Sequence, residues 1–231
     1  MERPKVLLVD VFDTLIPLSE PTVQYVRATY GLDWKVEDLT ANKKASLRFR
    51  QLTEECLEEF IIKREYPSLF PDAAPGLQQF ADEGYRIHVV TSGTEAYSPF
   101  ISFLLDEISN IAEFHFQSSK IALEMTENEM RSETLRLAQE RCELAKRIGA
   151  TAGIDDSFTN VLTMAVGADM RMCLRIHPWN NDSLIFGDIT SCHSIPEAFT
   201  IITTNKSSIV DLNKIPTSHL AKPSEQNSTT T

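Results

Sequence analysis

The stretch LLVDVFDTL, residues 7–15, joins a strand-like apolar run to two aspartates. Its first residues are continuously apolar, which is typical of a strand of a parallel sheet that is buried on both faces. Asp10 ends that run, and Phe12, Asp13 and Thr14 follow before the chain returns to apolar residues. An acid at the end of a buried strand is either a helix cap or part of a ligand site, so Asp10 is the first candidate functional residue.

Short apolar runs rich in β-branched residues recur along the chain. Together with 5–10, they predict buried strands at 85–91, 113–117, 151–155 and 169–176. Helical patterns separate the later runs, at 75–84, 131–148 and 157–167. Strands that alternate with helices indicate an α/β protein with a parallel sheet.

The interval 18–72 departs from this alternation. It holds no convincing strand, its apolar residues recur at helical spacing, and it is longer than a crossover needs. We therefore expect a helical cap at 18–72, inserted between the two core segments 1–17 and 73–204. From 205 to 231 the composition shifts to Ser, Thr, Asn, Lys and Pro, which predicts a disordered tail.

Composition limits the class of partner. The chain has 231 residues, 42% of them hydrophobic, and a formal charge of −11. With no cluster of Lys and Arg, binding to nucleic acid or to an anionic membrane is not expected, and a small molecule is the favoured partner. No apolar segment approaches the length of a leader or a membrane span, which favours a cytoplasmic protein. The sequence leaves the oligomeric state open.

Acidic residues end two of the predicted strands. Asp10 ends the first, and Asp155 and Asp156 end the fourth. The carboxyl ends of parallel strands form a common crevice, where three carboxylates repel one another unless a cation neutralises them. Oxygen ligands of this kind suit Mg²⁺, so the charges predict a magnesium site.

A hydroxyl-bearing turn ends the second predicted strand. Thr91, Ser92 and Gly93 supply a hydroxyl and backbone N–H groups, which can bind an anion. Carboxylates, Mg²⁺ and an anion site at one edge of a sheet together predict phosphoryl transfer.

Three segments together resemble the haloacid dehalogenase superfamily: DVFDTL at 10–15, YRIHVVTSG at 85–93 and GIDDSFTNVLTMAVGADMRMCLRI at 153–176. The resemblance extends over about residues 5 to 180. It implies a haloacid dehalogenase-like fold, in which a doubly wound parallel sheet forms the middle of three α/β/α layers. It also implies that 18–72 corresponds to the helical cap of the subgroup that contains dehalogenases and many phosphatases of small metabolites.

The resemblance implies a role for individual residues. Asp10 matches the nucleophile that forms an aspartyl-phosphate, and Thr14 matches a threonine that braces the loop. Thr91 matches the hydroxyl that binds the transferring phosphoryl group. Asp155 and Asp156 match the acid pair that binds Mg²⁺ with Asp10, and the backbone carbonyl of Phe12 is a further candidate ligand.

Three positions depart from the phosphatase pattern. Phe12 stands where a second aspartate protonates the leaving group, and loss of such a group typically costs about 10²–10⁴ in rate. Asp13 takes a position usually held by glycine, and we expect the turn to direct it elsewhere. Arg131, in the segment MRSETLRLA at 130–138, stands where the family has a lysine. Lys120 is the alternative for that role.

These observations leave three hypotheses for the function. The first is a Mg²⁺-dependent phosphatase of a small phosphorylated metabolite. The second is a degenerate member that binds a phosphorylated ligand or a protein partner, as Phe12 and Arg131 would suggest. The third is a 2-haloacid dehalogenase, because those enzymes carry an aromatic residue at the position of Phe12, although the pair Asp155 and Asp156 is of the metal-binding type.

Other titratable residues have simpler interpretations. His88, His115 and His177 fall in or beside predicted strands, where we expect hydrogen-bonded core or strand-end residues rather than ligands. A run of glutamates in the predicted cap is expected to form the solvated face of a helix; these are Glu54, Glu55, Glu58 and Glu59.

Overall fold

The computed structural model describes residues 4–40, 46–94, 97–120, 125–180 and 190–204. The tail predicted to be disordered, 205–231, lies outside these residues. The four cysteines fall inside them and are buried free thiols.

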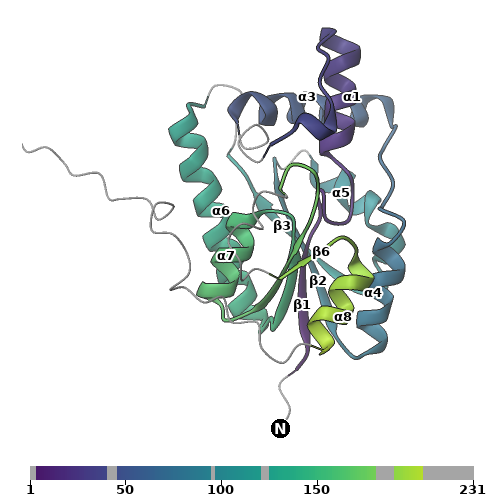
Figure 1. Cartoon of the computed structure of the whole chain (residues 1–231), viewed down its shortest axis with the longest axis vertical. Helices are drawn as coiled ribbons and strands as arrows, with labels where there is room; N and C mark the ends of the chain where they lie inside the picture. Colours follow the sequence, from purple (N-terminus) through teal and green to yellow (C-terminus); the bar gives the residue numbers. More distant parts are fainter. Residues whose placement is uncertain (1–3, 41–45, 95–96, 121–124, 181–189, 205–231) are drawn as a thin grey trace, which may run out of the picture.

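One parallel sheet forms the centre of the molecule, and its six strands follow the order β3-β2-β1-β4-β5-β6 (Figure 1). The strands are β1 Val6–Asp10, β2 Arg86–Gly93, β3 Ala112–Ser118, β4 Ala152–Asp155, β5 Arg171–Arg175 and β6 Ser191–Cys192. Every pairing between neighbouring strands of this sheet is parallel. The predicted α/β fold with a parallel sheet is therefore confirmed. Strand β6 was not predicted, because a strand of two residues leaves no periodic signal.

Helices cover both faces of the sheet, which gives the three layers that the resemblance implies. Helices α6 and α7 lie on one face, and α4 and α8 lie on the other (Figure 1). The helices are α1 Ser19–Tyr30, α3 Leu47–Lys63, α4 Ala73–Asp82, α5 Ser98–Leu104, α6 Glu127–Ile148, α7 Phe158–Gly167 and α8 Ile195–Thr204, with single 3₁₀ turns η1 Val36–Asp38 and η3 Asp106–Ile108. Because β1 is central in the sheet, the ligand crevice is at the middle of the carboxyl edge.

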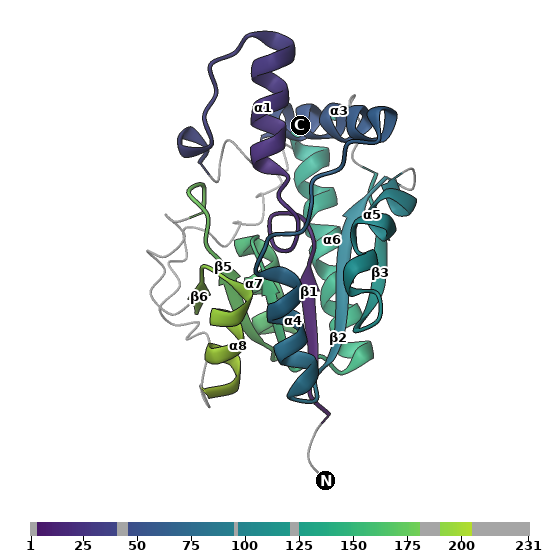
Figure 2. The same cartoon turned by 90° about the vertical axis from the view of Figure 1, so that its right-hand side faces the viewer.

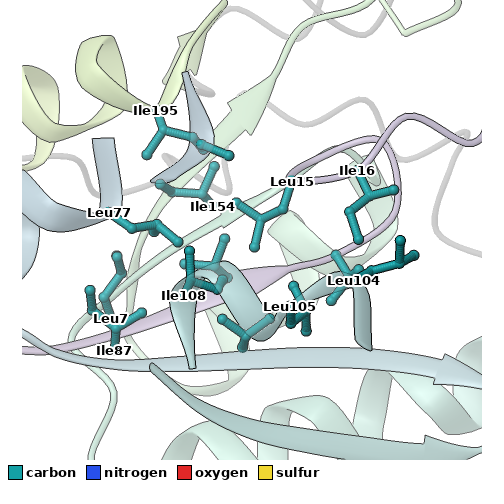
Figure 3. Close-up of a cluster of buried hydrophobic side chains, with 14 of the residues drawn as sticks. Leu7, Leu15, Ile16, Leu77, Ile87, Leu104, Leu105, Ile108, Ile154 and Ile195 are labelled. Atoms are coloured by element: carbon teal, nitrogen blue, oxygen red, sulfur yellow. The ribbon is translucent and has the colours of Figure 1, made fainter. Parts of the chain in front are cut away.

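The two faces of the sheet bury separate apolar clusters. Side chains alternate along a strand, so Leu7 and Val9 of β1 join one cluster, whereas Leu8 joins the other. Figure 3 shows the larger cluster, where Leu77 of α4 and Ile195 of α8 pack over the sheet. Burial on both faces accounts for the continuous apolar character of the strand sequences.

Helix α6 has well-defined ends. Thr126 and Glu129 form a reciprocal capping box at its start, and Gly149 ends it with φ 70°. These signals hold 22 residues in one helix that runs along the sheet. The register of α6 consequently fixes which of its side chains reach the carboxyl edge of the sheet.

The described residues of the interval 18–72 contain two α-helices and one 3₁₀ turn and no strand. Helices α1 and α3 lie beyond the carboxyl end of the sheet, at the top of Figure 2. Val23, Leu39, Phe49 and Trp179 form a small apolar cluster of their own beside these helices. This arrangement suits a cap over the crevice, and the division of the chain into core and cap stays a prediction.

Among the described helices, none has both the length and the apolar character needed to cross a lipid bilayer.

Candidate active site

A cavity of about 610 Å³ lies at the carboxyl end of the sheet. Asp10, Thr91 and Asp156 line it from the strand ends. Helix α3 contributes a second set of lining residues, which are Phe49, Arg50, Thr53, Glu54 and Leu57. The cavity is therefore enclosed by the strand ends on one side and by the helical interval 18–72 on the other.

The three predicted acids come together at this edge. Oxygen atoms of Asp10, Asp155 and Asp156 lie within 4.8 Å of one another. The three residues are 8%, 1% and 9% exposed. Strands β1 and β4 are direct neighbours, so their last residues meet at the same edge of the sheet.

Arg141 of α6 joins two of these carboxylates. Its Nη1 atom donates to Oδ1 of Asp10 and to Oδ2 of Asp155, at 2.7 Å in both cases. Its Nε atom donates to Oε1 of Gln117, at 3.2 Å. The guanidinium is buried, so this contact joins α6 to β1, β3 and β4 in a region with little water.

The two cations predicted for this position lie elsewhere. Arg131 and Lys120 are both exposed, and neither is among the described residues that line the cavity. The backbone N–H of Lys120 donates to Oε1 of Glu133, at 2.7 Å. Neither residue is thus brought to the carboxylates, and Arg141 is the cation that contacts them. A signal existed in the sequence: Arg141 interrupts the apolar stripe of α6 formed by Leu137, Ala138, Cys142 and Leu144.

Burial, with repulsion between carboxylates, raises the pKa values of Asp10 and Asp155. Burial raises the pKa of Asp10 well above its ordinary value; the charge of Asp155 adds to this rise, and Arg141 opposes it. Burial also raises the pKa of Asp155, with Arg141 opposing the rise and Asp156 adding to it. One guanidinium therefore does not balance three carboxylates.

The cluster fits a divalent cation. A cation such as Mg²⁺ would offset the remaining negative charge, and carboxylate oxygens are the ligands it prefers. Asp10, Asp155 and Asp156 are within the spacing that such an ion needs, and Phe12 lines the same cavity. The residues predicted to hold Mg²⁺ are thus brought together, and their role stays a prediction.

Asp155 and Asp156 are held by a hydrogen-bond network that the sequence did not reveal. Oδ1 of Asp155 accepts from the backbone N–H of Ser157 at 2.8 Å, and Nδ2 of Asn160 lies 3.2 Å from Oδ2. Nδ2 of Asn180 donates to the backbone carbonyls of Asp156 and Arg175, at 2.9 and 2.7 Å. These contacts fix the loop after β4 against the end of β5.

The loop after β1 turns sharply and directs Asp13 away from the carboxylates. Asp13 has φ 58°, a left-handed conformation in which glycine is favoured and aspartate is tolerated. Its Oδ1 accepts from the backbone N–H groups of Leu18 and Ser19, at 2.8 and 2.9 Å. Its Oδ2 accepts from the Ser19 hydroxyl at 2.6 Å. Asp13 therefore caps the start of α1, as a carboxylate at a helix N-terminus is expected to do.

The predicted phosphate-binding residues and the predicted loop-bracing threonine occupy different environments. Thr91, Ser92 and Gly93 all line the cavity. Thr14 is fully buried, and its hydroxyl has no hydrogen-bond partner among the described residues. Its backbone carbonyl accepts from Nη1 of Arg175 at 2.6 Å. The loop is thus held at Thr14 through the backbone.

Helix α3 brings two charged residues to the cavity. Arg50 and Glu54, one helical turn apart, are both half-buried and line it. Burial lowers the pKa of Arg50, and the charges of Glu54 and Asp156 oppose that shift. Burial raises the pKa of Glu54. The prediction that Glu54 belongs to a solvated helix face is wrong, because the helix faces the strand ends and not bulk water.

Removing the guanidinium tests whether it stabilises the acid cluster. Replacement of Arg141 by Met leaves Asp10 and Asp155 buried without their cation, so we expect a loss of about 3–5 kcal/mol in the free energy of unfolding. Urea titration without divalent ions measures this loss. The matched control is Arg131→Met on the exposed face of the same helix, which should change stability by less than about 0.5 kcal/mol. Equal stability of the two variants would contradict the role given to Arg141.

Comparison with known proteins adds support for the fold. No protein-family model matches the chain, and no curated protein is significantly similar to it in sequence. Solved structures do match. One of them is a dehalogenase whose crystal structure was solved with an intermediate complex. Its sequence is 13% identical to this chain, the TM-score is 0.54, and the match covers 89% of this chain and 100% of that one.

Two further structures match over similar lengths. A proposed phosphoglycolate phosphatase from Lactobacillus delbrueckii is 12% identical with a TM-score of 0.56, covering 87% of this chain and 99% of that one. A proposed haloacid dehalogenase-like hydrolase from Bacteroides fragilis is 14% identical with a TM-score of 0.54, covering 84% and 99%. Together with the parallel sheet and the acids at its carboxyl edge, these matches show that the chain has the fold of the haloacid dehalogenase-like hydrolase superfamily.

Proposed function

We propose that this protein is a Mg²⁺-dependent phosphatase that acts on a small phosphorylated metabolite. The observation that supports this most directly is the contact between Arg141 and Asp10 within a cluster of three buried carboxylates. The cluster combines a nucleophile, a fixed cation and ligands for a divalent ion. The cavity above it, at about 610 Å³, has the size of a small-molecule site.

Asp10 is the nucleophile in this proposal. Arg141 holds the carboxylate through Oδ1, and no other described residue donates a hydrogen bond to Asp10. The second oxygen, Oδ2, is therefore available to a ligand in the cavity. In-line attack by the carboxylate on phosphorus breaks the bond to the leaving oxygen and forms an aspartyl-phosphate, which water then hydrolyses.

Residues around Asp10 bind and orient the phosphoryl group. Thr91 and Ser92 supply hydroxyl groups from the last residues of β2, which Gly93 ends, and Arg141 supplies a fixed positive charge. The sequence predicted a turn with free backbone N–H groups here, but the three residues belong to the strand and pair with β3. Bound Mg²⁺, held by Asp10, Asp156 and the Phe12 carbonyl with Asp155 beside them, would supply positive charge that reduces repulsion between Asp10 and the phosphate.

Contacts from α3 complete the substrate site. Arg50 and Glu54 offer charged groups above the strand ends, and Phe49 and Leu57 offer apolar surface. A substrate that carries both a polar group and a short carbon skeleton suits this lining. Closure of α3 over the substrate would exclude water while the phosphoryl group is transferred.

Phe12 has a packing role in the structure. Its ring is half-buried and packs against the larger apolar cluster while it lines the cavity. A phenyl ring carries no proton, so this position neither protonates the leaving group nor activates water. The proposal therefore includes a slow overall turnover, in which the leaving oxygen takes its proton from water. For a phosphomonoester whose leaving group is acidic enough to depart as an anion, hydrolysis of the aspartyl-phosphate is the slow step.

Phosphate release is the direct test of the proposed activity. We expect the wild-type protein to release phosphate from a panel of small phosphomonoesters in the presence of Mg²⁺, and release should stop when EDTA removes the metal. Asp10→Asn should lower the rate by at least about 10³-fold, because the amide is a far weaker nucleophile. Arg131→Met, which alters an exposed residue, should keep the wild-type rate.

Other outcomes would contradict the proposal. Phosphate release that persists in Asp10→Asn would exclude Asp10 as the nucleophile. Halide release from 2-haloacids without metal, in place of phosphate release, would favour the dehalogenase alternative. Folded protein that binds Mg²⁺ and releases neither product would favour a degenerate member with a binding role.

The position of Phe12 allows a test by gain of function. Phe12→Asp places a carboxyl group where the family pattern has its general acid and base, so we expect phosphate release to rise by about 10²-fold or more. Steady-state rates across the phosphomonoester panel measure the change.

The matched control is Phe12→Asn, which has nearly the same shape and the same loss of apolar packing but carries no transferable proton. Circular dichroism and urea titration should show equal stability for the two variants. Equal rates for Phe12→Asp and Phe12→Asn would show that proton transfer at this position does not limit turnover.

A further inference from the structure

A second cluster of metal-ligating side chains lies away from the cavity, on strands β2 and β3. It consists of His88, Glu113 and His115, whose potential ligand atoms lie within 4.8 Å of one another. None of the three lines the cavity that contains Asp10. The cluster therefore has no part in the proposed phosphatase site.

Sheet register explains why these side chains meet. His88 is paired with Glu113 across β2 and β3, and His115 is two residues further along β3. Side chains two residues apart on a strand point to the same face, so all three project from one face of the sheet. Strand β3 is at the edge of the described sheet, where the cluster can be reached from solvent.

The distances fit a single ion. Nδ1 of His88 and Nε2 of His115 lie 2.8 Å apart. Glu113 spans both rings, with Oε2 at 3.6 Å from His88 Nδ1 and Oε1 at 3.6 Å from His115 Nε2. Zinc binds nitrogen and oxygen at about 2.0–2.2 Å, which in a tetrahedral site separates its ligand atoms by about 3.3–3.6 Å. A movement of the two rings apart by about 0.5 Å would give that geometry.

One ring nitrogen of His88 lacks a hydrogen-bond partner among the described residues. The residue is 2% exposed, and its Nε2 atom has no hydrogen-bond partner among the described residues. All its described polar contacts come from the Nδ1 side, where His115 and Glu113 lie. The Nδ1 atom therefore faces the cluster and is placed to bind an ion, whereas Nε2 lies on the other side of the ring and would not contact that ion.

The rings are also in the right protonation state to bind a metal. Burial lowers the pKa of His88, and the charges of His115 and Arg86 lower it further, while Glu113 opposes them. Burial likewise lowers the pKa of His115, with Arg147 adding to the shift and Glu113 opposing it. Both shifts favour the neutral imidazole, which is the form in which histidine binds a metal.

We propose that His88, His115 and Glu113 bind one zinc ion, with water as the fourth ligand. Two imidazoles and one carboxylate select a borderline metal such as Zn²⁺ over Mg²⁺, which prefers oxygen. In the bound state each ring carries its proton on its other nitrogen, so the hydrogen bond between the rings is replaced by two metal bonds. The ion joins edge strand β3 to β2 and does not depend on the proposed phosphatase activity.

Zinc binding to the full-length protein tests this site. Metal-free protein is dialysed against Zn²⁺ in excess Mg²⁺, which occupies the carboxylate cluster, and bound zinc is measured by elemental analysis. We expect about one zinc per chain for the wild type, none for His115→Ala, and at least about 10-fold weaker binding for Glu113→Gln. Both altered side chains are partly or largely exposed, so these variants should fold, which circular dichroism checks.

Two control variants distinguish zinc bound at this cluster from zinc bound to an exposed histidine or to the carboxylates of the cavity. His193→Ala changes an exposed histidine outside the cluster and should keep the zinc, and Asp156→Asn should keep it as well. Absence of zinc from the wild-type protein would overturn the proposal. Equal zinc in the wild type and His115→Ala, or loss of zinc in Asp156→Asn, would also overturn it.

Discussion

The buried contact of Arg141 with Asp10 and Asp155 is the interaction on which the candidate site depends. Two carboxylates with little exposure lie beside a third, and isolated charges of this kind are costly to remove from water. The guanidinium makes their burial possible, because one nitrogen donates to both residues. It also couples α6 to the two central strands, so the position of Asp10 depends on how this helix packs.

Buried ion pairs give little net stability, since desolvation consumes most of the Coulomb energy. Their value lies more in fixing one arrangement than in strengthening the fold. At this site Arg141 restricts Asp10 to one orientation, while Ser157 and Asn160 orient Asp155. The remaining negative charge is the physical reason for expecting a divalent cation, and it comes from the same residues that hold the nucleophile.

A second set of contacts connects the helical interval to the sheet. Nη1 of Arg175 donates to the Thr14 carbonyl, and its Nη2 donates to Oδ1 of Asp72 at 2.9 Å. The backbone N–H of Phe70 donates to the carbonyl of Leu15 at 2.8 Å. The chain segments that enter and leave the interval 18–72 are therefore held against each other. Next to them, Asp13 accepts hydrogen bonds at the start of α1. This network sets how α3 lies over the strand ends.

The sequence predicted the sheet well, because strands buried on both faces leave continuous apolar runs that end in polar residues of the candidate site. Asp10, Thr91 and Asp155 were found for that reason. Arg141 was missed because its contact depends on the register of a long helix, whereas the prediction of Arg131 relied on the resemblance of its segment to the family pattern. Glu54 was misread because a helix that faces a cavity has the same pattern of charges as one that faces water. The pairing of His88 with His115 needed the strand register, which sequence alone does not provide.

The slow hydrolysis proposed from Phe12 makes the central claim directly measurable. If Asp10 accepts a phosphoryl group and hydrolysis is slow, the covalent form should accumulate. Mass spectrometry of protein quenched in acid after incubation with Mg²⁺ and a reactive phosphomonoester would detect it. We predict an added mass of one phosphoryl group on the peptide that contains Asp10, absent from Asp10→Asn. Phosphate release without any such adduct on Asp10 would contradict this account.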